Sequence, residues 1–254
     1  MTPEHVLVPY QCSPLPPGPW LIFAPHADDE TFGMGGSLYL AARQGIETVV
    51  VVMSDGALGG EADDLVERRQ SEVRAAASLL GVNTLHLWDF PDRGLSTGAV
   101  ADAAIAKAAA CIADCQPGTV FMPGMLELHP DHRATANVVW SALQQLHERP
   151  WRGLRPASWF YEISVQSPVN HLVDISAAVD VKKQAMEIYA SQNSENNYPE
   201  LILALNKART FSMPPEVSHV EAYFQVPETQ WGWSLQKICQ TAIDRYFEAG
   251  ETKE

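Results

Sequence analysis

The chain has 254 residues, a length that suits one large α/β domain with a sizeable core. Its 31 acidic residues outnumber its 17 basic ones, and the formal net charge is −14. This balance argues against nucleic acid as the main partner, because such binding needs a basic footprint. Apolar runs fall short of the ~18–20 residues that a membrane span needs. The N-terminal segment lacks the basic and then apolar pattern of a signal peptide. We expect a cytoplasmic protein with no membrane partner.

Strand and helix signals alternate along the first part of the chain. The run at 48–53 is almost entirely β-branched, as expected of a strand that is buried on both faces. In chain order, the expected elements are strand 21–24, helix 34–43, strand 48–53, helix 63–80, strand 84–88, helix 101–114, strand 119–122 and helix 133–147. This alternation predicts an α/β protein, with a Rossmann-like, mostly parallel sheet flanked by helices.

The last third of the chain is less regular. The expected elements there are strand 158–165, helix 177–190, a polar loop at 191–199, helix 201–207, strand 220–226 and helix 235–247. No internal repeat and no linker long enough to separate domains interrupts the chain. We therefore expect a single domain that covers residues 1–254.

The segment Pro25-His26-Ala27-Asp28-Asp29-Glu30 follows the first expected strand. His26 and Asp29 are three residues apart, so a turn or helix start can direct both at one ion, and imidazole with carboxylate suits zinc. Asp28 remains as a carboxylate beside the metal, where a general base for an activated water belongs. Glu30 is expected to accept hydrogen bonds behind the ligands. The alternative is a helix start enriched in acids, which favour the positive end of the helix dipole.

A second cluster, His129-Pro130-Asp131-His132, follows the strand expected at 119–122. Pro130 suits the first position of a helix, which makes His129 the N-cap. His129 and His132 are then neighbours on one helical face, so one can bind the metal while the other stands over the substrate. A catalytic zinc usually has three protein ligands, and one of these histidines would complete the set. The alternative is a polar helix cap.

Three weaker features have ordinary structural explanations. The segment at 33–36, GMGG, lacks the GxGxxG order of a dinucleotide loop, and close packing of a helix on a sheet explains its glycines. Arg69 and Glu72 share one helical face and would form a solvated surface pair. Asp92 follows a proline and suits a turn.

The two clusters together resemble the motifs of the LmbE-like, or PIG-L, deacetylases. These are zinc-dependent enzymes that remove acetyl groups from N-acetylglucosamine-type sugars. The first family motif reads approximately A-H-P-D-D-E, and the second, H-P-D-H, is intact at 129–132. Ala27 stands where the family usually has proline, which changes the rigidity of the turn and removes no ligand. Weaker similarities extend from residue 21 to about residue 224.

Carried over by position, the resemblance implies that His26, Asp29 and His132 bind the metal. Zinc is the expected ion, with Fe²⁺ and Co²⁺ as alternatives. The resemblance also makes Asp28 the general base, in agreement with the argument from its position beside the ligands.

The remaining implied roles concern the substrate. His129 would polarise the acetyl carbonyl and stabilise the oxyanion, and we expect its ring to be protonated while it acts. Asp131 would orient a histidine. Arg69 and Asp92 would hold sugar hydroxyls.

We thus expect a hydrolase that removes the acetyl group from an N-acetylated amino sugar, or from its conjugate, by means of activated water. One alternative is an amidase that acts on a larger sugar conjugate. Another is a non-catalytic domain that binds sugar or metal, although mere metal retention does not require Asp28. The sequence leaves open the identity of the sugar and whether the chain forms homo-oligomers.

Overall fold

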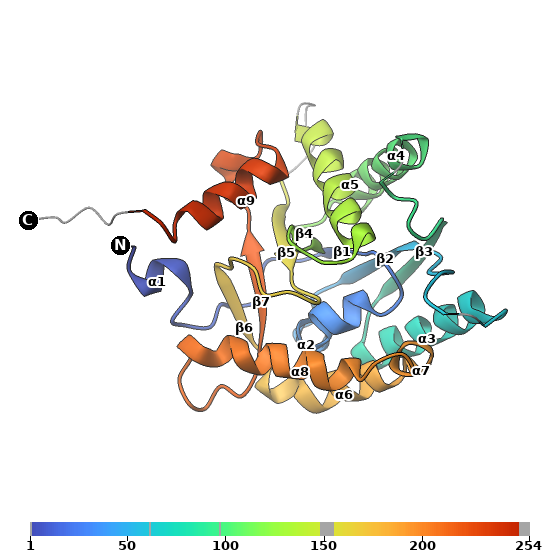
Figure 1. Cartoon of the computed structure of the whole chain (residues 1–254), viewed down its shortest axis with the longest axis horizontal. Helices are drawn as coiled ribbons and strands as arrows, with labels where there is room; N and C mark the ends of the chain where they lie inside the picture. The colour runs from blue at the N-terminus through green and yellow to red at the C-terminus, as the bar shows by residue number, and fades with distance from the viewer. Residues whose placement is uncertain (1, 61, 97, 148–154, 249–254) are drawn as a thin grey trace, which may run out of the picture.

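A mostly parallel sheet runs through the molecule (Figure 1). The computed structural model describes residues 2–60, 62–96, 98–147 and 155–248. The strands are β1 (Trp20–Ala24), β2 (Thr48–Ser54), β3 (Thr84–Phe90), β4 (Thr119–Pro123), β5 (Ala157–Tyr161), β6 (His171–Asp174) and β7 (Val220–Gln225). Among the described residues they form one sheet in the order β3-β2-β1-β4-β5-β7-β6. The first five strands in this sheet are parallel, and β7 is antiparallel to both of its neighbours. The expected α/β fold is confirmed.

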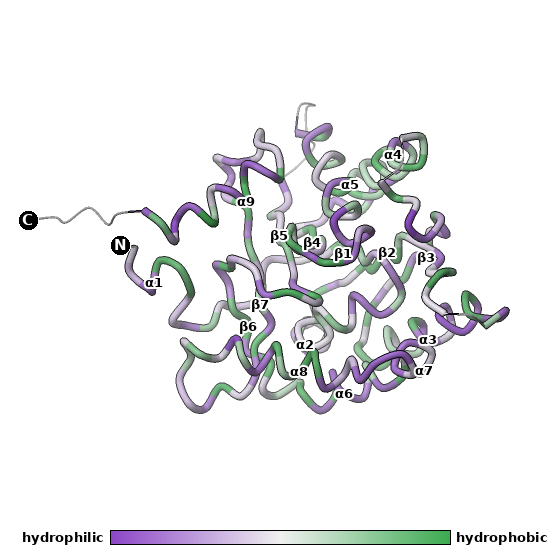
Figure 2. Tube along the Cα trace, in the orientation of Figure 1, coloured by the Kyte–Doolittle hydropathy of each residue, from purple (hydrophilic) through white to green (hydrophobic). Residues whose placement is uncertain are grey.

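Helices cover both faces of the sheet. They are α1 (Glu4–Leu7), α2 (Asp29–Arg43), α3 (Leu65–Leu80), α4 (Gly98–Cys115), α5 (Pro130–His147), α6 (Val179–Glu187), α7 (Ala190–Asn193), α8 (Tyr198–Ala208) and α9 (Leu235–Asp244). One hydrophobic core lies between the sheet and α4, α5 and α9. A second lies between the sheet and α2, α3, α6 and α8, and a smaller third one gathers around β6 and β7. Hydrophobic residues gather along the central strands (Figure 2), because both faces of these strands are buried. No helix in the described part of the chain is long and apolar enough to cross a membrane.

The strand order places a topological switch point at the centre of the sheet. Strand β1 pairs with β2 on one side and with β4 on the other, and both pairs are parallel. The chain therefore moves outward from β1 to β3 and then returns to the opposite side of β1 as β4. In open α/β sheets, ligands bind at the carboxyl ends of the strands at such a point.

Close packing and a buried ion pair hold α2 against its neighbours. A Cβ atom added at Gly33 would lie 2.4 Å from Cδ2 of Tyr161 on β5, which confirms the explanation expected for the glycines of this helix. The carboxylate of Glu221 on β7 accepts hydrogen bonds from the amides of Gly36 and Ser37, each at 2.8 Å. Lys182 on α6 donates to the same carboxylate at 2.7 Å, and both side chains are fully buried. These contacts hold α2 against β5, β7 and α6.

The structure differs from the expected elements mainly where contacts between distant segments determine the secondary structure. Helix α2 begins at Asp29 rather than Met34, and β5 ends at Tyr161 rather than residue 165. Helix α7 lies within the expected polar loop, and β6 had not been expected. Strand β6 pairs only with β7 among the described residues, a partner about 50 residues further along the chain, so local periodicity carried little sign of it.

Candidate active site

The two sequence clusters meet where β1 and β4 end. Residues 25–28 connect β1 to α2, and residues 124–129 connect β4 to α5. Asp28, the residue before α2, has φ 141° and ψ −33°, a backbone conformation that residues other than glycine rarely adopt. Backbone strain of this kind concentrates at functional sites, because the surrounding structure must hold it in place.

Two histidines flank one carboxylate oxygen in this region. Oδ2 of Asp29 lies 3.1 Å from Nδ1 of His26 and 3.2 Å from Nε2 of His132. Two atoms bound to one tetrahedral zinc through bonds of about 2.0–2.2 Å are roughly 3.3 Å apart. All three side chains are buried. The separation of Asp29 from each histidine is therefore compatible with two ligands of one divalent ion.

Two groupings of three ligand atoms share His26, and neither includes Asp29. The ligand atom of His26 lies within 4.8 Å of those of His129 and His132, and likewise within 4.8 Å of those of Asp92 and Asp131. The separations around Asp29 are shorter, and they combine one carboxylate with two imidazoles, a donor set that zinc favours. Asp29 therefore has the shortest contacts with two imidazoles in this region.

Asp29 and the two histidines each shift the pKa of the other toward its charged form. Burial opposes ionisation of Asp29, but the charge and hydrogen bond of His132 outweigh it and lower the pKa of this carboxyl. Burial also disfavours the charged form of His132, yet Asp29 raises the pKa of that imidazole to about 9. The pKa of His26 is raised well above its usual value by Asp131, Asp29 and Asp92, against the effect of burial. Without a metal, the site thus presents an ionised carboxylate between two imidazolium groups, and a bound cation would replace one proton on each ring.

Asp28 has the electrostatic properties of a base that works near neutral pH. Burial raises the pKa of its carboxyl to about 7, with Arg69 opposing and Asp29 reinforcing the shift. The side chain of Glu30 accepts the amide hydrogen of Asp28 at 3.2 Å, the hydroxyl of Thr31 at 2.7 Å and the hydroxyl of Tyr189. Glu30 therefore stabilises the strained turn that contains Asp28.

The surroundings of His129 favour the neutral form of its ring. Nδ1 of His129 accepts a hydrogen bond from the amide of Asp131 at 3.2 Å, so the proton of the neutral ring lies on Nε2. Burial lowers the pKa of this imidazole, and the charges of His26 and His132 lower it further. The lowered pKa favours the neutral ring in the protein without metal or substrate, because these two effects outweigh the attraction of nearby carboxylates, and protonation of the ring while it acts stays a prediction. A neutral ring still offers Nε2–H as a hydrogen-bond donor.

Asp92 and Asp131 lie at the second ring nitrogen of His26. Nε2 of His26 is 3.4 Å from Oδ1 of Asp92 and 3.5 Å from Oδ2 of Asp131. Asp131 also accepts the amide hydrogen of Arg93 at 2.6 Å, and Asp92 accepts that of Leu58 at 2.9 Å. A carboxylate at this position orients an imidazole and fixes its tautomer.

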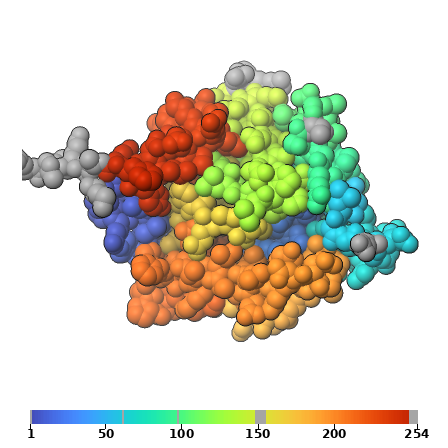
Figure 3. Space-filling view, in the orientation of Figure 1, coloured from blue at the N-terminus to red at the C-terminus, as the bar shows by residue number. Residues whose placement is uncertain are grey.

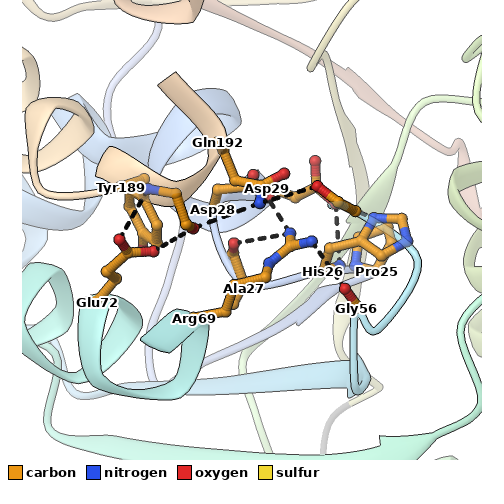
Figure 4. A network of polar contacts seen from close by, with 12 residues as sticks. Pro25, His26, Ala27, Asp28, Asp29, Gly56, Arg69, Glu72, Tyr189 and Gln192 are labelled. Atoms are coloured by element: carbon orange, nitrogen blue, oxygen red, sulfur yellow. Dashed lines mark hydrogen bonds and ion pairs between the residues drawn. The ribbon is translucent and has the colours of Figure 1, made fainter. Parts of the chain in front are cut away.

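Arg69 lies inside the molecule, so the expected solvated pair with Glu72 is wrong. Its guanidinium donates to the carbonyl of Ala27 at 3.1 Å and to that of Gly56 at 3.3 Å, and it lies 3.4 Å from Asp28 (Figure 4). Glu72 instead accepts two hydrogen bonds from Ser191 on α7. The packing of α7 on α3 brings Ser191 to Glu72, and the loops after β1 and β2 supply the partners of Arg69, which helical spacing cannot reveal.

Glu127 is a site residue that the sequence analysis did not identify. Its Oε2 lies 3.5 Å from Nδ1 of His132, and its side chain is buried. Oε1 accepts the amide hydrogens of Ile163 at 2.7 Å and Ser164 at 3.1 Å, which holds the carboxylate in place. The only local signal was an acid two residues before the second cluster.

These residues open into a cavity of about 710 Å³. Its lining includes the metal donors, Asp28, Arg69, Asp92 and His129. A second hollow of about 770 Å³ lies over α6, α7 and α8 and contains none of these residues. Titratable groups with shifted pKa values converge on the first cavity, which is therefore the candidate active site.

Comparisons with known proteins agree on one family. The family model described as PIG-L: GlcNAc-PI de-N-acetylase matches residues 21–143, a segment that contains both clusters. Diacetylchitobiose deacetylase of Thermococcus kodakarensis is 32% identical over 194 residues, which cover 69% of this chain and 70% of that protein. A Bacillus anthracis protein named "Probable N-acetyl-alpha-D-glucosaminyl L-malate deacetylase 2" is 27% identical over 193 residues, or 68% of this chain and 80% of that one. The solved structure of a conserved protein of Thermus thermophilus is 27% identical, has a TM-score of 0.70 and covers 85% of this chain and 99% of its own.

Proposed function

This chain belongs to the PIG-L family of de-N-acetylases, and from that premise we propose that it is a metal-dependent hydrolase. It removes the acetyl group from an N-acetylated amino sugar of the N-acetylglucosamine type, or from a conjugate of such a sugar. The observation that carries the proposal is the buried carboxylate of Asp28, with its pKa raised to about 7, beside donors that suit one divalent ion.

His26, Asp29 and His132 would hold the metal. Zinc suits one carboxylate and two imidazoles, and Fe²⁺ or Co²⁺ could replace it, because availability as well as geometry determines which ion is bound. A bound ion of this kind supplies Lewis-acid polarisation of a carbonyl oxygen and lowers the pKa of a water molecule. The orientation of the imidazoles follows from the carboxylates beside them, Glu127 at His132 and both Asp92 and Asp131 at His26.

Two residues of the chain carry the proton transfer and the stabilisation of charge. The carboxylate of Asp28 accepts a proton from the attacking water and then delivers it to the departing amine nitrogen. Nε2–H of His129 donates to the acetyl oxygen as negative charge develops on it. A neutral imidazole performs this task as a donor, so the lowered pKa of His129 is compatible with the role.

The sugar is held by residues that line the same cavity. We assign Arg69 and Asp92 to the sugar hydroxyls. Both line the cavity, and Nε of Arg69 is buried without a hydrogen-bond partner among the described residues. A buried donor of this kind gains free energy when a ligand oxygen accepts from it. Asp131 and Glu30 position the histidine and the base, respectively.

The proposal is tested by measuring acetate release beside metal content. Protein loaded separately with Zn²⁺, Fe²⁺ and Co²⁺ is offered N-acetylglucosamine, its disaccharide and a panel of other N-acetylated conjugates. We expect metal-dependent acetate release that Asp28→Asn abolishes. Release only from large conjugates would favour the amidase alternative. Stoichiometric metal with no release from any amide would indicate a binding domain and contradict the proposal.

A further inference from the structure

One wall of the active-site cavity is an apolar helix face. Tyr198, Leu201, Ile202 and Leu205 of α8 line the cavity, and their spacing of three, four and seven residues puts them on one side of the helix. Ile202 is 5% exposed and packs in the core, whereas Leu201 is 48% exposed. The apolar wall thus extends from the interior of the protein to the surface.

Two other exposed leucines complete the wall at the mouth of the cavity. Leu58, in the loop between β2 and α3, is 58% exposed, and Leu128, in the loop between β4 and α5, is 72% exposed. In Figure 3 the surface is hollowed between α8 and the segment that follows β4. Single exposed leucines are ordinary, but three from separate segments around one cavity form a surface suited to an apolar ligand.

Burial along the cavity separates two apolar regions. Phe32 and Ile163 are each 4% exposed and line the cavity together with the metal donors. An acetyl methyl group at the reacting centre would therefore contact residues of this buried region. The exposed leucines border solvent, so they meet the part of the substrate farthest from the amide. The cavity volume of about 710 Å³ also falls in the range of sites for drug-sized ligands, larger than one monosaccharide fills.

We propose that Leu58, Leu128 and Leu201 bind an apolar alkyl or aryl group attached through the glycosidic oxygen of the acetylated amino sugar. This inference rests on the proposed function and specifies the substrate class for it. The sugar lies against the polar residues that line the cavity, among them Arg69 and Asp92. The apolar group packs against the three leucines at the mouth of the cavity and is thereby removed from water. Hydrophobic contacts of this kind are non-directional, so chain length matters more than the shape of the group.

The test compares N-acetylglucosamine glycosides with methyl, butyl and hexyl groups, at concentrations below their aggregation. Full burial of one methylene favours binding about fourfold, and roughly twofold is expected at a surface that stays partly exposed. We therefore expect kcat/KM to rise on the order of 30-fold between the methyl and hexyl glycosides. The double variant Leu128→Asn/Leu201→Asn should reduce this rise to a few-fold. Leu79→Asn, which alters a leucine on α3 that is 39% exposed and outside the cavity lining, is the matched control and should keep the full rise.

Calorimetric binding of the same glycosides to Asp28→Asn separates this inference from the proposed function. Tighter binding of the hexyl glycoside without acetate release by the wild-type protein would support the apolar site and reject deacetylation. Acetate release that is independent of glycoside length would overturn the inference and leave deacetylation standing. A gain from N-hexanoyl rather than from hexyl glycoside would overturn it too, because the apolar chain would then belong to the acyl group. Conversion of a dimer to a monomer by the double variant, with no effect of chain length, would show that the leucines cover a subunit interface.

Discussion

Replacing Glu127 by glutamine tests whether a buried carboxylate orients the proposed metal ligand His132. The neutral ring of His132 can place its proton on Nδ1, facing Oε2 of Glu127 at 3.5 Å, and leave Nε2 free toward Asp29. In Glu127→Gln, Oε1 can keep the hydrogen bonds from Ile163 and Ser164, whereas the second contact of the Ser164 amide, with Oε2 at 3.1 Å, is lost. The amide NH₂ then faces Nδ1–H, so two donors oppose each other and the ligating tautomer is disfavoured.

The magnitude follows from the geometry. Loss of a carboxylate behind a histidine ligand typically lowers metal affinity about 10- to 100-fold. The separation of 3.5 Å is long for a hydrogen bond, so we expect the lower end, about tenfold, or ~1.4 kcal/mol. Little change in unfolding free energy is expected, because both backbone donors remain paired. Glu127→Ala would instead leave two amides without an acceptor, at about 1–3 kcal/mol each.

Competition with a chromogenic chelator measures the metal affinity, and urea denaturation of the metal-free protein measures stability. The matched control is Glu195→Gln, because Glu195 is an exposed acid that lines the same cavity. This control removes one negative charge near the site without altering a contact of His132. Affinity of Glu127→Gln within twofold of the wild type, or an equal loss in the control, would refute the orienting role.

Four further predictions concern the base, the oxyanion donor and the buried ion pair. Asp28→Asn should retain metal and lose at least about 10²-fold in kcat, whereas His132→Ala should lose metal as well. Metal analysis beside acetate release separates the two variants. Near wild-type turnover of Asp28→Asn would contradict the mechanism. Because only ionised Asp28 accepts a proton and its pKa is raised to about 7, kcat/KM should fall about tenfold per unit below pH 7; a flat profile down to about pH 5 would place the base elsewhere. His129→Ala should keep its metal and lower kcat about 10²- to 10³-fold with little change in KM. Because the lowered pKa of His129 favours its neutral ring, any alkaline limb of the pH profile should survive this substitution, and its disappearance would show that the protonated ring acts. Lys182→Met should lower the unfolding free energy by about 3–5 kcal/mol in urea denaturation, because Glu221 would remain buried without its cation. A loss below about 1 kcal/mol would mean that the hydrogen bonds to Glu221 are sufficient to stabilise its buried charge.

Local patterns in the sequence were sufficient for the order of elements and for the chemistry of the two clusters. The β-branched run in β2 and the glycine after α3 are signals carried by a few adjacent residues, and the structure agrees with both. The glycines at 33 and 36 indicated close packing, which the structure shows against Tyr161 and Ile175. Spacing also predicted that His26 and Asp29 would act together, because a separation of three residues constrains two side chains within one turn.

Contacts between distant segments decided the rest. Sheet order brought His132 to Asp29, and the packing of α7 on α3 paired Ser191 with Glu72. Glu127 lies in the loop after β4, and the amides of the segment that follows β5 hold its carboxylate beside His132. The lowered pKa of His129 likewise depends on burial and on charges from both clusters.

The sequence by itself therefore determined which groups are available and which strands carry them. The tertiary structure decided which of these groups are buried, which pairs touch and in which protonation state they act. The physical reason is the difference in sequence range between the interactions involved. Helix and strand periodicity arises from neighbours a few residues apart, whereas desolvation and ion pairing depend on every segment that surrounds a group after folding.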